Sequence, residues 1–295
     1  MNLNNGVWHG AIFVQVGGDV EGYSAVVIKF RFELYRLDEV SPWGGHQAVL
    51  HWFGLTEGWY WLEARGQELL RRTRQVDPHP YIDYYLARFW EDLIALTPEV
   101  LEPVPDDLQP FIASDQAEWT IHPLDFVREP DEERPDGGSA DMPDHPVVTA
   151  AIWHSEHRLD FGYLRNPPKL RLWRTIRGDR DEITMDWRHE DDGEIGFTAD
   201  PKVRLSVPAT AYLEAVHVLD RELMDAMGKR VEDLEHRGGL PGVDLDLAHL
   251  RREHEDRRHW LAKNLDRSPK TDWNVVRQGA RLLLGDVQPD LRGIG

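Results

Sequence analysis

Arginine, aspartate and tryptophan gather between residues 153 and 188, and together these residue types could bind an anionic ligand. The group comprises Arg158, Asp160, Tyr163, Arg165, Arg171, Arg174, Asp186 and Arg188, among Trp153, Trp173 and Trp187. Guanidinium groups bind carboxylates and phosphates through paired hydrogen bonds, and they stack on indole rings. The stretch therefore predicts a clamp for an anionic ligand or an acidic partner. We favour the simpler alternative, in which arginine–aspartate pairs cross between strands on a solvated face and the tryptophans belong to the core.

Two nearby histidines raise the possibility of a metal or acid–base site. On a strand, His154 and Glu156 would share one face while His157 would point to the other. His51 or His189 could complete such a half-site. We favour the alternative, in which these are polar residues on the wet face of an edge strand. We therefore predict no metal and no cofactor.

A helical histidine pair near the C-terminus is a weaker candidate for a metal site. His254 and His259 lie five residues apart, which is about 140° around a helix of 3.6 residues per turn, so they cannot share a zinc ion. His254 falls on an apolar stripe, and we expect it to be a buried core residue.

The sequence contains no motif of nucleophilic or nucleotide chemistry. It has no G-x-S-x-G, no P-loop and no G-x-G-x-x-G. It also has no cysteine, which excludes disulfides, thiolate nucleophiles and cysteine-bearing zinc sites. Carboxylate pairs for glycosidic chemistry stay open among the 53 acidic residues.

An aromatic motif at residues 51–63 supplies further candidate binding residues. These are His51, Trp52, Glu57, Trp59, Tyr60 and Trp61. Trp59 and Trp61 share one face of a predicted strand and Tyr60 takes the other, so either the tryptophans or the tyrosine must face outward.

The same motif resembles a second one about a hundred residues later. In each, an acid, a glycine and a tyrosine precede an amphipathic stretch that ends in Arg-Thr. The distance from Tyr60 to Thr73 is 13 residues, and the distance from Tyr163 to Thr175 is 12. This pattern predicts a duplicated strand-then-helix unit.

Composition limits the classes of partner. The net charge of −19 argues against binding to a nucleic-acid backbone and favours a basic protein partner. The 12 tryptophans indicate either large cores or an aromatic-lined surface. No run of about 18 apolar residues is present, so we expect no membrane span and a cytoplasmic location.

Hydrophobic periodicity predicts the elements that must position these residues. Strands are predicted at 30–34, 47–53, 59–64, 147–154, 157–164, 169–176, 182–187, 194–198 and 203–207, with Glu57-Gly58 in a turn. Helices are predicted from Ile82 to Thr97-Pro98, from Pro208 to Gly238-Gly239, from 247 to 265, and from an N-cap at Thr271 or Asp272 to Gly285.

These elements predict an α+β fold with two strand-rich antiparallel units, each followed by a long amphipathic helix, and a C-terminal helical pair. The predicted parts are a loose N-terminal extension (1–25), a first half (26–128), an acidic Pro/Gly linker or loop (129–146), a second half (147–236) and C-terminal helices (240–295). Oligomeric state does not follow from the sequence.

Several motifs resemble an uncharacterised family common in actinobacteria. They are Phe30-Arg31-Phe32-Glu33-Leu34, Leu37-Asp38-Glu39-Val40 with Pro42-Trp43-Gly44, the HWFGLTEGWYW motif at 51–61, RLDFGYL at 158–164, and Asp186-Trp187. The resemblance covers residues 28–235 and leaves out the C-terminal helices. The family is a domain of unknown function, so the resemblance implies no activity.

Two functions from different classes follow. The first is a cytoplasmic acidic interaction protein of the immunity or antitoxin type that binds a basic partner. The second is an enzyme or small-ligand binder with a Trp/Arg/His-lined cleft between the two halves, where His51, His154, His157 and Glu57 would supply acid–base groups.

Overall fold

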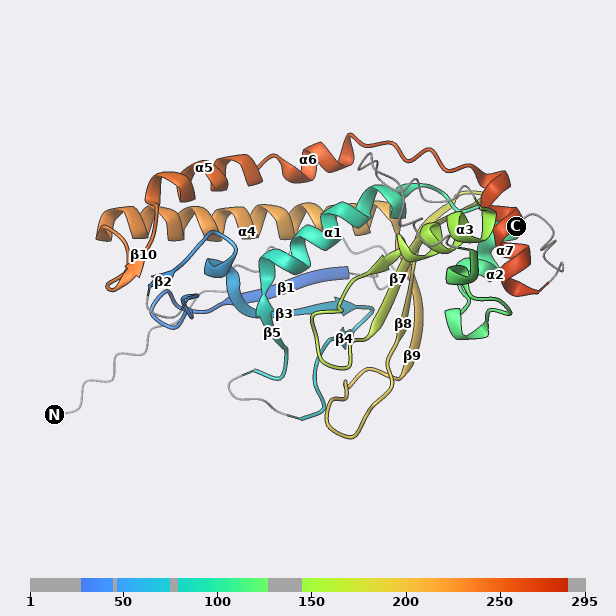
Figure 1. Cartoon of the computed structure of the whole chain (residues 1–295), viewed down its shortest axis with the longest axis horizontal. Coiled ribbons are helices and arrows are strands. Elements are labelled where there is room, and N and C mark those ends of the chain that lie inside the picture. The colour runs from blue at the N-terminus through green and yellow to red at the C-terminus, as the bar shows by residue number, and fades with distance from the viewer. Residues whose placement is uncertain (1–27, 45–46, 75–78, 127–144, 286–295) are drawn as a thin grey trace, which may run out of the picture.

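The computed structural model describes residues 28–44, 47–74, 79–126 and 145–285, and it shows the predicted α+β fold (Figure 1). The predicted N-terminal extension lies outside the described residues. So does the acidic segment 129–146, except for its last two residues, which begin a helix.

The first sheet is antiparallel and centres on β3. It contains β1 (Ile28–Leu34), β3 (Glu57–Ala64), β4 (Gln67–Leu69) and β5 (Ile82–Tyr85). Glu57-Gly58 is not a turn, because both residues pair with β5 and Gly58 also pairs with β1. A Cβ at Gly58 would lie 2.3 Å from the Glu33 carbonyl oxygen, so the close approach of β1 requires glycine there.

The strand predicted at 47–53 is much shorter in the structure. Only β2 (Ala48–Val49) forms, and it pairs in parallel with β10 (Val243–Asp244). The chain then turns through a 3-10 helix at Gly54–Thr56 into β3.

The second sheet is also antiparallel, with its strands in sequence order. It contains β6 (Arg158–Leu159), β7 (Lys169–Arg177), β8 (Arg180–Arg188) and β9 (Lys202–Pro208). The strand predicted at 157–164 ends early, because the Asp160 side chain accepts a hydrogen bond from the Gly162 backbone and turns the chain. The strand predicted at 194–198 was wrong; there Phe197 makes a single bridge to Arg72.

The two long helices follow the sheets as predicted. The predicted start of the first helix at Ile82 was wrong, because Ile82–Tyr85 pair with β3 as strand β5. Helix α1 (Leu86–Leu101) begins after them, and it continues past the predicted end through Pro98 in its last turn. Helix α4 (Ala209–Arg237) ends at Gly238, whose φ of 73° is the left-handed conformation that glycine favours at this position.

The segment predicted as a strand at 147–154 is helix α3 (Pro146–Ser155), so that prediction was wrong. Pro146 occupies the first turn, and the His145 side chain accepts a hydrogen bond from the Val147 backbone. The apolar run lacked a helical period because the open side of α3 is also apolar, with Ile152 exposed and Ala151 half-buried, which removes the contrast between faces.

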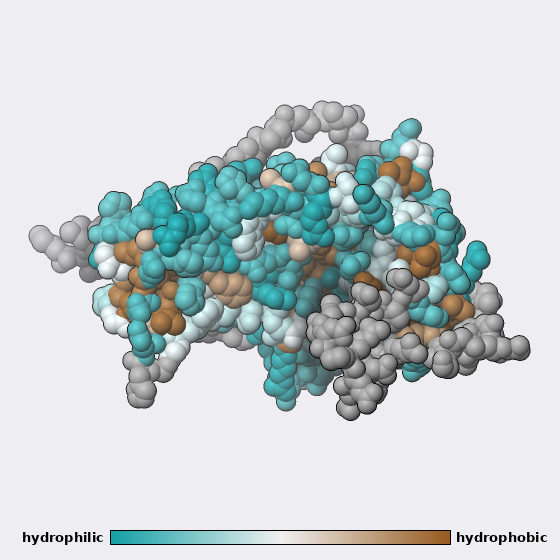
Figure 2. Space-filling view, turned by 45° about the horizontal axis from the view of Figure 1, so that its top comes forward, coloured by the Kyte–Doolittle hydropathy of each residue, from teal (hydrophilic) through white to brown (hydrophobic). Residues whose placement is uncertain are grey.

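Of the remaining helices, α2 (Gln109–Ile112) and α7 (Trp273–Leu284) lie at one end of the molecule, α5 (Leu247–Arg257) lies toward the other end, and α6 (Trp260–Leu265) lies between them (Figure 1). Helices α2 and α7 lie beside α3, and α7 has the predicted N-cap Asp272 and C-terminal Gly285. One helix predicted at 247–265 is divided into α5 and α6, which run along α4 and α1. The surface along α5 and α6 is mostly hydrophilic, whereas hydrophobic patches appear at the end of the molecule where α2, α3 and α7 lie (Figure 2).

One hydrophobic core joins both sheets. It contains Phe30 and Tyr60 from the first sheet, Leu172 and Trp187 from the second, and Leu219 from α4. Helix α4 contacts β1 as well as β8 and β9, so it lies against both sheets. The two predicted halves thus form separate sheets with a shared core.

A buried cation connects α5 and α6 to this core. The Arg257 guanidinium lies 4.3 Å from the ring centres of both Trp52 and Trp260, and it pairs with Glu91 and Glu253. His254 is buried as predicted, and its Nδ1 accepts a hydrogen bond from Trp52 Nε1 at 3.3 Å. Cation–π contacts and ion pairs together offset the cost of burying the arginine.

A second, smaller core covers the outer face of β7. Trp173 packs there with Phe111 of α2, Trp153 of α3 and Val276 of α7. The second sheet is therefore buried on both faces at β7, because Leu170 and Leu172 belong to the shared core while Trp173 packs with α3 and α7.

The two aromatic motifs of the proposed duplication adopt different structures. Tyr60 lies in the middle of β3, whereas Tyr163 lies in the loop between β6 and β7. The two tyrosines nevertheless meet, with their hydroxyl oxygens 2.7 Å apart. The two motifs therefore share residue types but not a common local structure, and their tyrosines form one contact between the two halves.

Close packing of α7 on α3 depends on Gly279. A Cβ there would lie 1.9 Å from the Pro146 carbonyl oxygen and 2.6 Å from the Ala150 side chain. We expect Gly279→Ala to lower the free energy of unfolding by about 2 kcal/mol, although alanine is the better helix former. Urea denaturation tests this, with Gly228→Ala in α4 as the control, since its added Cβ meets only two His254 ring atoms, at 3.3 and 3.8 Å. Equal stability of the two variants would show that α7 can shift freely.

Two buried histidines predict that stability falls in acid. Burial first, and the charge of Arg171 second, lower the pKa of His154 to about 3; burial also lowers the pKa of His157 to about 4. The folded protein keeps both rings neutral below pH 6.5, while the unfolded chain takes up protons there. The free energy of unfolding should therefore decrease as pH falls, by up to about 1.4 kcal/mol per pH unit for each histidine.

The variant His154→Leu isolates this effect. Neither ring nitrogen of His154 has a hydrogen-bond partner among the described residues, so leucine costs little at pH 7. We expect the variant to lose less stability than the wild type between pH 7 and pH 5, measured by urea denaturation. The exposed His217→Leu is the matched control. Asp92, whose pKa is raised to about 6 by burial, acts in the opposite direction and is common to all three proteins. Parallel pH profiles for wild type and His154→Leu would contradict the assignment.

Candidate functional site

The structure separates the predicted site residues into an outer face on each sheet and a buried set. On β3, burial alternates strictly, so Tyr60 points into the core and Trp59 and Trp61 point outward. This answers the question that the sequence left open. Pairing places Glu33 and Asp83 on either side of Trp59.

Five rings form a continuous row on the outer face of the first sheet. We call Tyr35, Trp59, His79, Tyr81 and Trp61 the aromatic row. Ring centres are 4.3 Å apart from Tyr35 to Trp59, 4.6 Å from Trp59 to His79 and 6.4 Å from His79 to Tyr81. Tyr81 stacks on Trp61 at 4.0 Å with an interplanar angle of 9°. All five side chains are half-buried, so each keeps part of its surface open to a partner.

Carboxylates border the aromatic row. Glu63 accepts a hydrogen bond from Trp61 Nε1 at 3.1 Å, and Glu68 accepts one from the Tyr81 hydroxyl at 3.1 Å. Glu33 lies 3.4 Å from His79. Burial and the neighbouring Asp83 raise the pKa of Tyr35, which keeps its hydroxyl protonated. Glu63 also pairs with Arg31 at 3.7 Å and Glu68 with Arg71, so Glu33 and Asp83 are the carboxylates at the row without an arginine partner among the described residues. The row thus combines open π-surfaces with these two carboxylates, which suits cationic groups.

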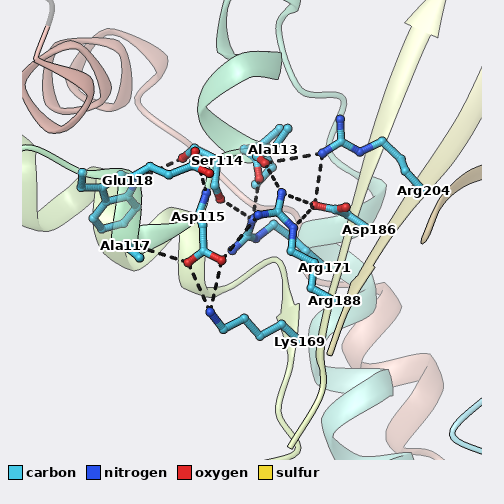
Figure 3. Close-up of polar contacts among 12 residues, drawn as sticks. Ala113, Ser114, Asp115, Ala117, Glu118, Lys169, Arg171, Asp186, Arg188 and Arg204 are labelled. Carbon is cyan, nitrogen blue, oxygen red and sulfur yellow. Dashed lines mark hydrogen bonds and ion pairs between the residues drawn. The ribbon is translucent and has the colours of Figure 1, made fainter. Parts of the chain in front are cut away.

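Arginines and aspartates on the outer face of the second sheet form a network (Figure 3). Asp186 accepts hydrogen bonds from Arg188 at 2.9 Å and from Arg204 at 3.2 Å. Asp115, which follows α2, pairs with Lys169 at 3.2 Å and with Arg188 at 3.5 Å.

The same network holds the carboxyl end of α2. Arg171 donates to the carbonyl oxygens of Ile112 and Ser114, both at 2.9 Å, and Arg188 donates to that of Ala113 at 2.6 Å. Burial lowers the pKa of Arg171 to about 10, so it stays charged at neutral pH. Cations at these carbonyls stabilise the helix terminus, so Arg171 and Arg188 have a structural use.

Trp173 and Arg174 are not part of this network, and their side chains lie on opposite faces of the sheet. Trp173 is buried and donates from Nε1 to Gln109 at 2.8 Å, with the Arg204 guanidinium 5.7 Å from its ring centre. Arg174 donates two hydrogen bonds to the Asp181 carboxylate, at 2.6 and 2.7 Å, and a third to the Leu101 carbonyl oxygen at 2.9 Å. Arg174 therefore connects the second sheet to the end of α1.

The predicted histidines do not share a site. Both are buried, His154 in the last turn of α3 and His157 in the turn that follows it, where His157 Nδ1 lies 2.8 Å from the Trp153 carbonyl oxygen. The strand-based expectation that His154 and Glu156 share a face was wrong, because the segment is helical. His51 is exposed beside Trp43, with ring centres 5.9 Å apart. Among the described residues, no group of three His, Asp or Glu side chains is arranged to hold a metal ion.

The other predicted residues have mainly structural contacts. Trp52 is buried in the core, and Glu57 accepts a hydrogen bond from the Ser41 backbone at 2.8 Å. Asp160 is exposed, 3.5 Å from Arg88, and Arg158 is half-buried opposite Arg171.

Sequence reasoning missed several residues of these two faces. On the first sheet they are Tyr35, His79 and Tyr81; on the second they are Asp115, Lys169 and Arg204. Alternation along β9 would have placed Arg204 outward, but the contacts of Asp115 join residues more than 50 positions apart and have no local signal.

No helix among the described residues is long and apolar enough to cross a membrane.

Comparison with known proteins gives a family. Residues 29–279 match the model of a family of unknown function, DUF5984. The match extends past residue 235, so the C-terminal helices belong to the shared part, contrary to the sequence-based estimate. No curated protein and no solved structure matched the chain. Because the family match covers most of the chain, the protein belongs to this family of unknown function, DUF5984.

Proposed function

We propose that this protein is a cytoplasmic interaction protein, of the immunity or antitoxin kind, that binds a basic protein partner through the aromatic row. The observation that carries the proposal is the row itself: five contacting rings on an outer sheet face, bordered by carboxylates. Tryptophan and tyrosine are the residues most enriched at the energetic centres of protein interfaces.

The row is already ordered before a partner arrives. Trp61 is fixed by stacking on Tyr81 and by its hydrogen bond to Glu63. Trp59 is held between Tyr35 and His79. Preordered side chains lose little conformational entropy on binding, which favours affinity.

Charge selects the kind of partner. The carboxylates of Glu33, Glu63 and Glu68 border the rings, and the whole chain carries a net charge of −19. Lysine and arginine side chains of a partner can lie over the indole rings and pair with these carboxylates. A nucleic-acid backbone would instead be repelled, so the proposal excludes it from this face.

Charge reversal and truncation on the row test the proposal. A partner is captured from a lysate of the native host at low salt, identified by mass spectrometry and purified. We expect Trp59→Ala and Trp61→Ala each to weaken its affinity at least tenfold, since central aromatic residues contribute about 2 kcal/mol or more. Calorimetry measures the affinities, and thermal unfolding checks that the variants fold.

The electrostatic part has its own control. Glu33→Lys with Glu63→Lys should weaken binding most at low salt, while Glu222→Lys, on the exposed side of α4, should leave it unchanged. Equal binding by wild type and row variants, or equal losses with Glu222→Lys, would contradict the proposal.

A further inference from the structure

The outer face of the second sheet is strongly basic, in contrast to the chain as a whole. The strand register places a single set of residues on this face. Eight of them are basic, namely Arg158, Lys169, Arg171, Arg177, Arg180, Arg188, Lys202 and Arg204. Only Glu182 and Asp186 are acidic. A protein with a net charge of −19 therefore concentrates positive charge here.

Part of this charge has a structural use and part does not. Arg171 and Arg188 are committed to α2 and Asp186, as described above. Arg177 has one exposed pair with Asp106 at 3.2 Å. Among the described residues, the exposed Arg180 has no ion pair, and the half-exposed Arg204 has Asp186 as its one charged partner. Arg177, Arg180 and Arg204 thus retain donor groups for a ligand.

These three arginines line one groove. The groove has a volume of about 490 Å³ and lies between β7–β9 and α2. Thr184 and Ser206 form its floor, with their hydroxyl oxygens 3.2 Å apart. Thr175 and Glu182, which pair across β7 and β8, complete the middle of the floor.

The strand register places the three arginines at two opposite ends of the groove. Arg177 pairs with Arg180 at the turn between β7 and β8, while Arg204 pairs with Asp186 six residues along β8. At about 3.3 Å per residue, the two backbone positions lie about 20 Å apart, and the long side chains can bend toward each other over the floor. Hydroxyl groups and one carboxylate lie between these cationic ends.

We propose that this groove binds a small polyhydroxylated molecule with an anionic group at each end, of the sugar bisphosphate class. Guanidinium groups bind phosphate oxygens bidentately, which suits both ends. Thr184, Ser206 and Glu182 can exchange hydrogen bonds with hydroxyl groups in the middle of the ligand. The Glu182 carboxylate disfavours an anion at the centre, so the ligand's charge belongs at its ends. This site lies on a different sheet from the aromatic row and does not depend on the proposed function.

Fructose 1,6-bisphosphate is a suitable probe, with fructose and inorganic phosphate for comparison. Calorimetry on the full chain at low salt should show binding of the bisphosphate, at least tenfold weaker binding of phosphate, and none of fructose. Arg180→Ala and Arg204→Ala should each weaken bisphosphate binding at least fivefold. Arg221→Ala, an exposed arginine on α4, is the matched control and should leave it unchanged.

A loss of binding in the Arg180 variants would not be due to unfolding, because Arg180 makes no ion pair within the described part of the chain. Arg180→Glu should therefore have the same melting temperature as the wild type, and it should bind the bisphosphate more weakly than Arg180→Ala does. The proposal is overturned if no bisphosphate binds at millimolar concentration, or if Arg221→Ala weakens binding as much as the groove variants. It is also overturned if a single-stranded oligonucleotide binds through the same arginines and the bisphosphate does not compete with it.

Discussion

Burial of one side of α4 against both sheets is the constraint on which the structure depends. Tyr212 and Leu219, nearer the start of the helix, and Leu223, Met227 and Leu234, further along it, are all buried. A helix of 29 residues is about 43 Å long, enough to lie along two sheets in succession. Since the inner faces of both sheets are used to bury this helix and α1, side chains that meet other molecules must lie on the outer faces.

The outer faces of the two sheets have opposite character because different elements cover them. On the second sheet, α2, α3 and α7 cover β7, and the arginines nearest to them are used to hold α2. On the first sheet, the aromatic row lies directly against the outward-facing charged residues of β1 and β5. One sheet therefore presents guanidinium groups beside a covering helix, and the other presents rings bordered by carboxylates.

Sequence periodicity predicted most of the strands and helices that have one side exposed to solvent. Alternation located β1, β3, β7, β8 and β9, and a helical stripe located α4 and its end at Gly238. It failed for α3, because the open side of this helix carries Ile152 and Ala151 and so has little polar character to reveal the helical period. The available signals were Pro146 in the first turn and His145 as a cap, and these outweigh an apolar run in deciding helix from strand.

The sequence predicted which residue types form the candidate sites, but not which residues they contact. Arg171 and Arg188 could be placed on one face, yet their main acceptors are carbonyl oxygens at 112–114, whose position depends on how α2 packs on the sheet.

Net charge was also insufficient to predict which ligands the protein can bind. It argues against binding of a long polyanion, which samples the field of the whole surface, but charges are screened beyond about 8 Å at physiological salt. A small ligand in a groove experiences only its lining residues, so an acidic protein can hold a basic site, and local register decides more than the sum of charges.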